Sequence, residues 1–247
     1  MFDQFLSNES RFGRLMTRLG ILIAANLLFL ISCIPVVTAG AGLCALHHTM
    51  LKTLRGDGGI NPFVQFWLGF KRNFKQATAA FLLLLMLAVV LTLEIFWCSQ
   101  FTGPVAAFRY GLYAIAMAAL VLALYLFPTM AAFDAPLPRL LANSFAFAMK
   151  SPLTALCVIV TSVVPVVLTL ASGRYQPLYA FIWCMIGASG LVMLHASMLL
   201  RLFLPYLPRV DVCGEIIPEG MEEEFITKEQ DTRNDRATLE DMLKLGM

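Results

Sequence analysis

Three polar side chains lie within long apolar stretches of this 247-residue sequence, and they are the residues best placed to do chemistry. They are Asn26, Glu94 and His195, each in a different stretch. An ionisable or strongly polar group is costly inside a membrane and often belongs to a substrate or proton path. We therefore take these three as a candidate intramembrane polar site. The alternative is structural hydrogen bonding, with Glu94, one turn from Trp97, reaching the outer interface.

Other residues with catalytic or ligating potential lack the spacing that their chemistry requires. His47 and His48 are adjacent, so on a helix they point about 100° apart and cannot grip one metal ion. Asp57 stands alone in RGDGG, which is typical of a turn. The six cysteines include no CxxC pair. The sequence therefore predicts no enzyme, no cofactor and no metal site.

Composition indicates that the elements holding these residues are membrane-spanning helices. Hydrophobic residues make up 59% of the chain and charged residues 14%, against about 25% charged in soluble domains. A helix of about 20 apolar residues crosses a bilayer core. Five stretches meet this condition, and we expect an all-α, polytopic transmembrane bundle with firm crossings at residues 19–37, 77–98, 105–133, 153–171 and 178–204.

The segment between the first two crossings decides the topology. Pro35 tends to end a helix, and Gly40 and Gly42 permit a sharp bend. We expect residues 36–54 to return as a short re-entrant or sixth helix, which places both termini in the cytoplasm. Sixteen of the eighteen Lys and Arg residues then face the cytoplasm, all but Arg109 and Arg174. Without the return, five crossings leave the basic N-terminus outside.

Residues 62–76 form the clearest local pattern in the sequence. Asn61 is a helix cap and Pro62 suits a first turn. We expect a cytoplasmic amphipathic helix whose three cations lie near its C-terminal end and meet lipid head groups, or whose aromatic stripe packs on a neighbouring helix. The residues proposed for this membrane or partner interface are Phe63, Phe66, Trp67, Phe70, Lys71, Arg72, Phe74 and Lys75.

Charge divides the chain into two regions. Residues 206–247 hold five Lys or Arg against eleven Asp or Glu, whereas residues 1–205 hold thirteen against five. We expect a transmembrane helical domain over 1–205 and an acidic cytoplasmic tail over 206–247. The basic residues lie beside aromatic membrane anchors, so the expected partner is the lipid bilayer and not nucleic acid.

Two stretches resemble a known family. NLLFLISCIPVVTAGAGLCALHHTMLKTLRGDGG and the following FWLGFKRNFKQAT resemble the YesL-like family, small integral membrane proteins of Gram-positive bacteria assigned to a domain of unknown function. The resemblance is strongest over residues 26–76. Such proteins are often encoded beside carbohydrate ABC transporter genes, and no catalytic residues are established for them. His47 and His48 depart from the family, whose members commonly have aromatic residues there.

The resemblance implies a non-enzymatic accessory or regulatory protein for ABC-type carbohydrate uptake, located in a bacterial cytoplasmic membrane. Its partners would be subunits of a carbohydrate ABC transporter. The alternative is an independent small-molecule transporter or channel that uses the intramembrane polar residues. The two hypotheses differ in whether the protein alone moves a substrate.

Overall fold

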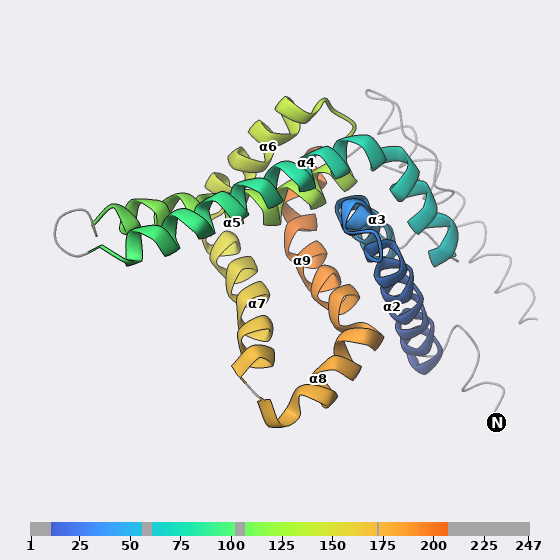
Figure 1. The fold of residues 1–247 in the computed structure, drawn as a ribbon. Coiled ribbons are helices and arrows are strands. Elements are labelled where there is room, and N and C mark those ends of the chain that lie inside the picture. The colour runs from blue at the N-terminus through green and yellow to red at the C-terminus, as the bar shows by residue number, and fades with distance from the viewer. Residues whose placement is uncertain (1–10, 56–60, 102–106, 172, 207–247) are drawn as a thin grey trace, which may run out of the picture. The chain divides into compact units, whose positions relative to one another are not determined.

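The computed structural model describes residues 11–55, 61–101, 107–171 and 173–206, and every element in these ranges is a helix (Figure 1). The acidic tail beyond Tyr206 and the predicted turn at Asp57 lie outside the described residues. The elements in chain order are α2 (Arg11–Cys33), η1 (Val36–Thr38), α3 (Ala39–Arg55), α4 (Pro62–Ser99), α5 (Phe108–Ala132), α6 (Leu137–Lys150), α7 (Pro152–Ala171), η3 (Gly173–Tyr175), α8 (Gln176–Ile182), the π-helix η4 (Trp183–Gly187), α9 (Ala188–Phe203) and η5 (Leu204–Tyr206).

Five helical segments are long and apolar enough to cross a membrane, which confirms the all-α polytopic bundle. Their outer surfaces carry large exposed apolar side chains, such as Met86 on α4 and Leu170 on α7. A soluble fold would bury such faces, so the protein is a multi-pass membrane protein. The five segments are Leu15–Cys33, Pro62–Ser99, Phe108–Ala132, Pro152–Ala171 and Gly173–Tyr206.

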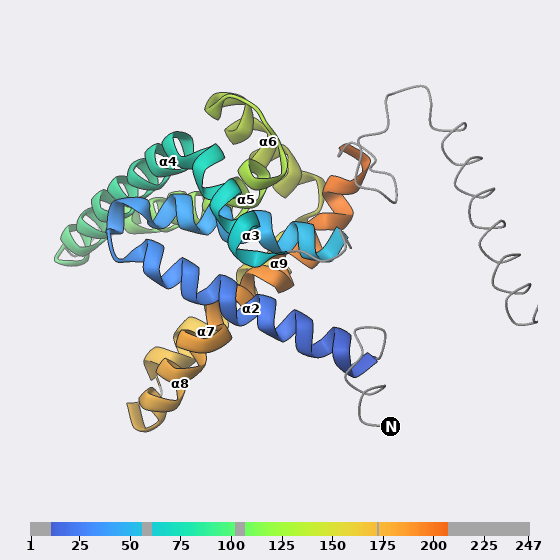
Figure 2. The ribbon, with the colours of Figure 1, turned by 90° about the vertical axis from the view of Figure 1, so that its right-hand side faces the viewer.

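The predicted short helix after the first crossing is confirmed. Helix α3 doubles back along α2, and Figure 2 shows the two running side by side in opposite directions. Its 17 residues reach about 25 Å, and nearly all of the stretch from Gly40 to Leu51 is buried. The hydrophobic core of the bundle gathers around α3, with contributions from α2, α4, α5, α6 and α9.

Of the three residues predicted to make this bend, Pro35 lies in it and the two glycines do not. The first helix ends at Cys33, four residues before the predicted limit, and Pro35 lies in the extended link before η1. The hydroxyl of Thr38 stabilises this connection between α2 and α3. It donates to the carbonyl oxygens of Ser32, at 2.6 Å, and of Pro35, at 2.9 Å. The prediction that Gly40 and Gly42 form the bend is wrong, because both lie inside α3.

These two glycines instead allow close helix packing. A Cβ atom added to Gly40 would lie 2.6 Å from the carbonyl oxygen of Ala77 on α4 and would also strike Phe81. A Cβ atom on Gly42 would strike the Ser32 side chain on α2. Small residues of this kind let helix backbones approach closely in membrane proteins. The two glycines therefore allow α3 to pack closely against both α2 and α4.

Helix α4 joins the predicted amphipathic segment and the second crossing into one helix of 38 residues. Asn61 caps it as predicted, its side chain accepting from the Phe63 N–H at 3.0 Å. Such a helix is about 57 Å long, well beyond a hydrocarbon core of about 30 Å, so its first turns extend outside the core. The ribbon of α4 bends within this N-terminal part (Figure 1).

Candidate functional site

A pocket of about 870 Å³ lies between α4 and the connection from α5 to α6. Helix α4 supplies residues from Trp67 to Gln76, and the connection supplies Asp134, Ala135 and Pro136. Three cations, Lys71, Arg72 and Lys75, stand against one carboxylate, so the lining carries a net charge of +2. The pocket thus combines cationic, amide and aromatic groups, a set suited to an anionic ligand with some apolar surface.

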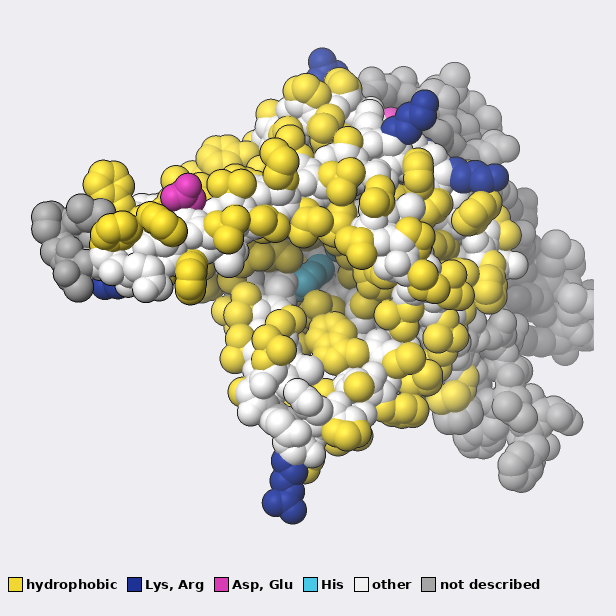
Figure 3. Space-filling model, viewed as in Figure 1, with side chains coloured by type: hydrophobic (Ala, Val, Ile, Leu, Met, Phe, Trp, Pro, Cys, Tyr) yellow, Lys and Arg dark blue, Asp and Glu magenta, His cyan; other side chains and the backbone are white. Residues whose placement is uncertain are grey.

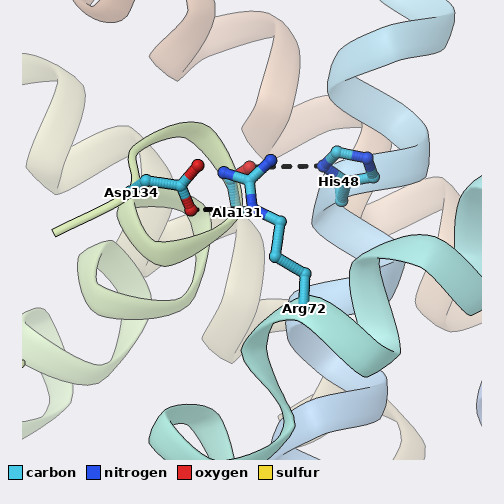
Figure 4. Close-up of polar contacts among 4 residues, drawn as sticks. All are labelled: His48, Arg72, Ala131 and Asp134. Carbon is cyan, nitrogen blue, oxygen red and sulfur yellow. Dashed lines mark hydrogen bonds and ion pairs between the residues drawn. The ribbon is translucent and has the colours of Figure 1, made fainter.

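An ion pair ties the two sides of this pocket together. The Nε–H of Arg72 donates to Oδ1 of Asp134 at 2.8 Å, and Figure 4 shows the arginine side chain rising from α4 toward the end of α5. The side chains are 34% and 74% exposed, respectively, so the pair adds little to stability. Its main effect is to fix the direction of the guanidinium group.

His48, on α3, contacts the end of α5. Its Nδ1 lies 3.3 Å from the carbonyl oxygen of Ala131 at the end of α5, and because a carbonyl only accepts, Nδ1 carries the proton (Figure 4). Its ring packs on Gly69, where a Cβ atom would come within 2.9 Å of the His48 Cβ. His48 is therefore a packing residue that connects α3, α4 and α5, and no metal-holding cluster of three His, Cys, Asp or Glu occurs among the described residues.

The predicted aromatic stripe on α4 is divided between two faces. Phe66 is buried at 3% exposure, whereas Phe63 and Trp67 are more than half exposed. Trp67 stacks on Phe70 with ring centroids 5.5 Å apart, and the ammonium group of Lys71 lies 5.2 Å from the indole centroid. One side of the stripe therefore packs on the bundle, as one of the two alternatives predicted, and the other side is unpartnered among the described residues.

The three cations do not lie near a helix C-terminus. The sequence placed Lys71, Arg72 and Lys75 at the end of a short helix, but α4 continues to Ser99. The helix dipole therefore does not stabilise these three cations, since its effect on charged side chains is confined to the first and last turns of a helix. Their contribution comes from the pocket that they line.

Asn26 is fully buried and joins α2 to the π-helix η4. Its amide nitrogen donates to the carbonyl oxygens of Trp183, at 3.0 Å, and of Cys184, at 2.7 Å. Its Oδ1 accepts the backbone N–H of Ser189 at 3.0 Å. A π-helical turn departs from the regular hydrogen-bond ladder, and a side chain inserted there satisfies the displaced groups. The Asn26 side chain thus forms hydrogen bonds with backbone groups of η4 and of the start of α9.

His195 joins α9 to α7. Its Nε2 lies 3.0 Å from the Thr161 hydroxyl and 3.3 Å from the Ser162 hydroxyl. Both hydroxyls donate to carbonyl oxygens of their own helix, so we assign the proton to Nε2 of His195. Figure 3 shows a hollow bordered by hydrophobic side chains on one face of the molecule.

Glu94 is not part of a polar cluster with these residues. It lies exposed on the surface of α4, while Asn26 bonds to η4 and His195 bonds to α7. The three residues therefore do not form one site. A second cavity of about 600 Å³ lies beside Thr161 and Trp183, between α7 and the α8–α9 segment, and its lining is mostly apolar.

Sequence reasoning missed two residues of the large pocket. Asp134 pairs with Arg72, and the signal was available, because Asp134 is the only acidic residue between Glu94 and Asp211. Asn73 lines the pocket beside the three cations, although the sequence drew attention to it only through the family resemblance. The other residues of the pocket on α4 were found from their aromatic and basic types, whereas the pairing of Asp134 with Arg72 depended on how a distant segment packs.

Comparison with other proteins gives one informative result. Searches of the curated proteins and of the solved structures found no significant match. The family described as "Protein of unknown function, DUF624" matches residues 22–95. This range begins within α2, includes the whole of α3 and ends within α4, so the chain is similar to that family over the helices that build the core around α3.

Proposed function

We propose that this protein is a non-enzymatic integral membrane protein that assists or regulates carbohydrate uptake by an ABC-type transporter. The carbohydrate part of the proposal rests on the YesL-like resemblance over residues 26–76. The docking part is supported by one structural observation, the exposed aromatic face of α4, where Phe63 is 59% exposed and Trp67 is 55% exposed. Exposed aromatic anchors beside cations are typical of surfaces that bind a partner.

The buried polar residues favour this proposal over a transport path. Asn26 bonds to three backbone groups, and His195 bonds to two hydroxyls on α7. Such bonds hold helices together, whereas a path requires polar groups that a substrate or proton can reach. The exposed face of α4, in contrast, has no partner among the described helices.

A pull-down from mild detergent tests the docking role. Tagged wild-type protein should recover permease or ATPase subunits of a carbohydrate transporter. Replacing both Phe63 and Trp67 with alanine should lower that recovery about fivefold or more, because exposed aromatic residues dominate many interfaces. The matched control replaces Phe96 and Trp97, which lie near the opposite end of the same helix and are 64% and 65% exposed.

Two outcomes would contradict the docking role. One is recovery of the tagged protein alone, under conditions that keep known transporter complexes intact. The other is an equal loss in both double variants, because the effect would then reflect general exposure of aromatic groups and not this surface.

The proposed location is a bacterial cytoplasmic membrane with both termini in the cytoplasm. The observation in favour is the antiparallel α2–α3 pair, since a return of the chain adds one passage through the bilayer to the five candidate spans. Single cysteines introduced at Ser10 and Thr227, in a cysteine-free background, should both react from the cytoplasmic side with an impermeant maleimide. Labelling from opposite sides would show that α3 does not return the chain across the membrane.

An independent transporter is the second candidate, and the cavity of about 600 Å³ favours it. This cavity adjoins the π-helix η4, and π-helical turns are frequent at functional sites. Liposomes that hold only this protein would then show substrate flux. Replacing His195 should abolish that flux, while replacing Glu94, which faces outward, should leave it unchanged.

A further inference from the structure

We propose that the pocket between α4 and the α5–α6 connection binds a phosphate group presented by the headgroup of an anionic membrane lipid. The proposal does not depend on the accessory role, because it concerns a ligand of this chain alone. It rests on three independent features of the pocket: its charge, an unpartnered buried amide, and its position along α4.

The charge of the pocket favours an anion. Lys71, Arg72 and Lys75 outnumber Asp134, and they lie within five consecutive residues of α4. Arg72 donates only its Nε–H to Asp134. Its two terminal nitrogens make no hydrogen bond among the described residues. A guanidinium group held at a fixed angle suits the paired oxygens of a phosphate group. Lys71 and Lys75 add point charges on either side of Arg72.

Asn73 supplies the second observation. The residue is 6% exposed and lines the pocket, and its Nδ2 is buried with no hydrogen-bond partner. A buried donor without an acceptor is costly, and an oxygen that reaches it removes the cost. A phosphate or glycerol oxygen bound in the pocket would supply the acceptor that this donor lacks.

Position along the helix selects a lipid as the source of the phosphate. The pocket ends at Gln76, and the apolar part of α4 begins at the next residue and spans about 33 Å to Cys98. That length matches the hydrocarbon core, so the pocket lies at the level of the head groups. The exposed Trp67 and Phe74 at its rim offer apolar surface to the first part of an acyl chain.

Binding can be measured with purified full-length protein in a neutral detergent. The probes are dioctanoyl phosphatidylglycerol, dioctanoyl phosphatidylcholine and inorganic phosphate. We expect the anionic lipid to bind at least about tenfold more tightly than the zwitterionic lipid, and inorganic phosphate to bind far more weakly than either. Replacing Lys71 and Lys75 together with glutamine should weaken binding of the anionic lipid about tenfold.

A matched control removes the same charge elsewhere. Arg139 and Arg201 are exposed and do not line the pocket, so replacing both with glutamine should change the affinity less than about twofold. Asp134→Asn should tighten binding about threefold, because it removes the one carboxylate that repels a phosphate group but keeps a side-chain oxygen that can accept the Nε–H of Arg72. A gain in affinity cannot come from misfolding, so this variant keeps the test decisive even if the lysine variant is unstable.

Three results would overturn the proposal. Equal affinity for the two lipids would remove the anion preference. An equal loss in the Arg139 and Arg201 variant would show a general charge effect. Tight binding of inorganic phosphate with the same dependence on Lys71 and Lys75 would assign the pocket to a soluble ligand.

Discussion

Replacing Asn26 with leucine will lower the free energy of unfolding by about 2–4 kcal/mol. The expectation follows from the three backbone groups that Asn26 satisfies, the carbonyl oxygens of Trp183 and Cys184 and the N–H of Ser189. Asn26 is completely buried, so water cannot replace it. Each buried group left without a partner costs about 1–3 kcal/mol in soluble proteins, and less on average in membrane bundles.

Unfolding in a mild detergent, followed by helicity as denaturant is added, measures this effect. Asn26→Asp should be at least as damaging, since a carboxylate accepts the Ser189 N–H but cannot donate to the two carbonyl oxygens. The control is Thr92→Val on α4, because the Thr92 hydroxyl bonds only to its own helix, at the carbonyl oxygen of Ala88, and is exposed. Its effect should stay below about 0.5 kcal/mol.

Backbone hydrogen exchange gives a second view of the same substitution. Loss of Asn26 should speed exchange in η4 and the start of α9, residues 183–189, more than in α3 or α5. Stability and exchange equal to those of the wild type would show that the π-helical turn holds its geometry without Asn26.

Asn26 shows which features of the candidate site could be predicted from the sequence and which could not. Its position inside an apolar stretch marked it as unusual, and that much follows from the cost of a polar group in lipid. Its bonding partners are 157 and 158 residues further along the chain, in a π-helical turn. The segment WCMIG has no composition that distinguishes a π-helix from an α-helix, so the bond could be known only from the packing.

The crossings were easier to predict than the contacts between them. Long apolar stretches are set by bilayer thickness, which is why five spans could be placed before the fold was known. The pocket at Arg72 was not predictable in this way, because Asp134 comes from a connection 62 residues away. Gly40 was misassigned because glycine permits both bends and close packing, and the sequence alone does not separate the two uses.

The second large effect is expected at Gly40, where α3 packs closely on α4. Gly40→Ala should lower the free energy of unfolding by about 3 kcal/mol. The new methyl group would lie 2.6 Å from the backbone oxygen of Ala77 and would also strike Phe81. A backbone oxygen inside a helix cannot move without moving the helix, so α3 and α4 must separate along their contact. Overpacking of this kind usually costs about 1–3 kcal/mol, and a backbone obstacle places Gly40 at the upper end.

The same substitution at two open positions separates packing from helix propensity. Gly20 in α2 and Gly111 in α5 have nothing within 4 Å of the added Cβ atom. Alanine there should leave stability unchanged or raise it by about 0.5–1 kcal/mol, because alanine favours the helix over glycine. If Gly40→Ala behaved like these two controls in the same unfolding measurement, the close α3–α4 contact would not limit stability. A loss at Gly40 alone would locate the constraint on the fold in the packing of the returning helix and not in the bend before it.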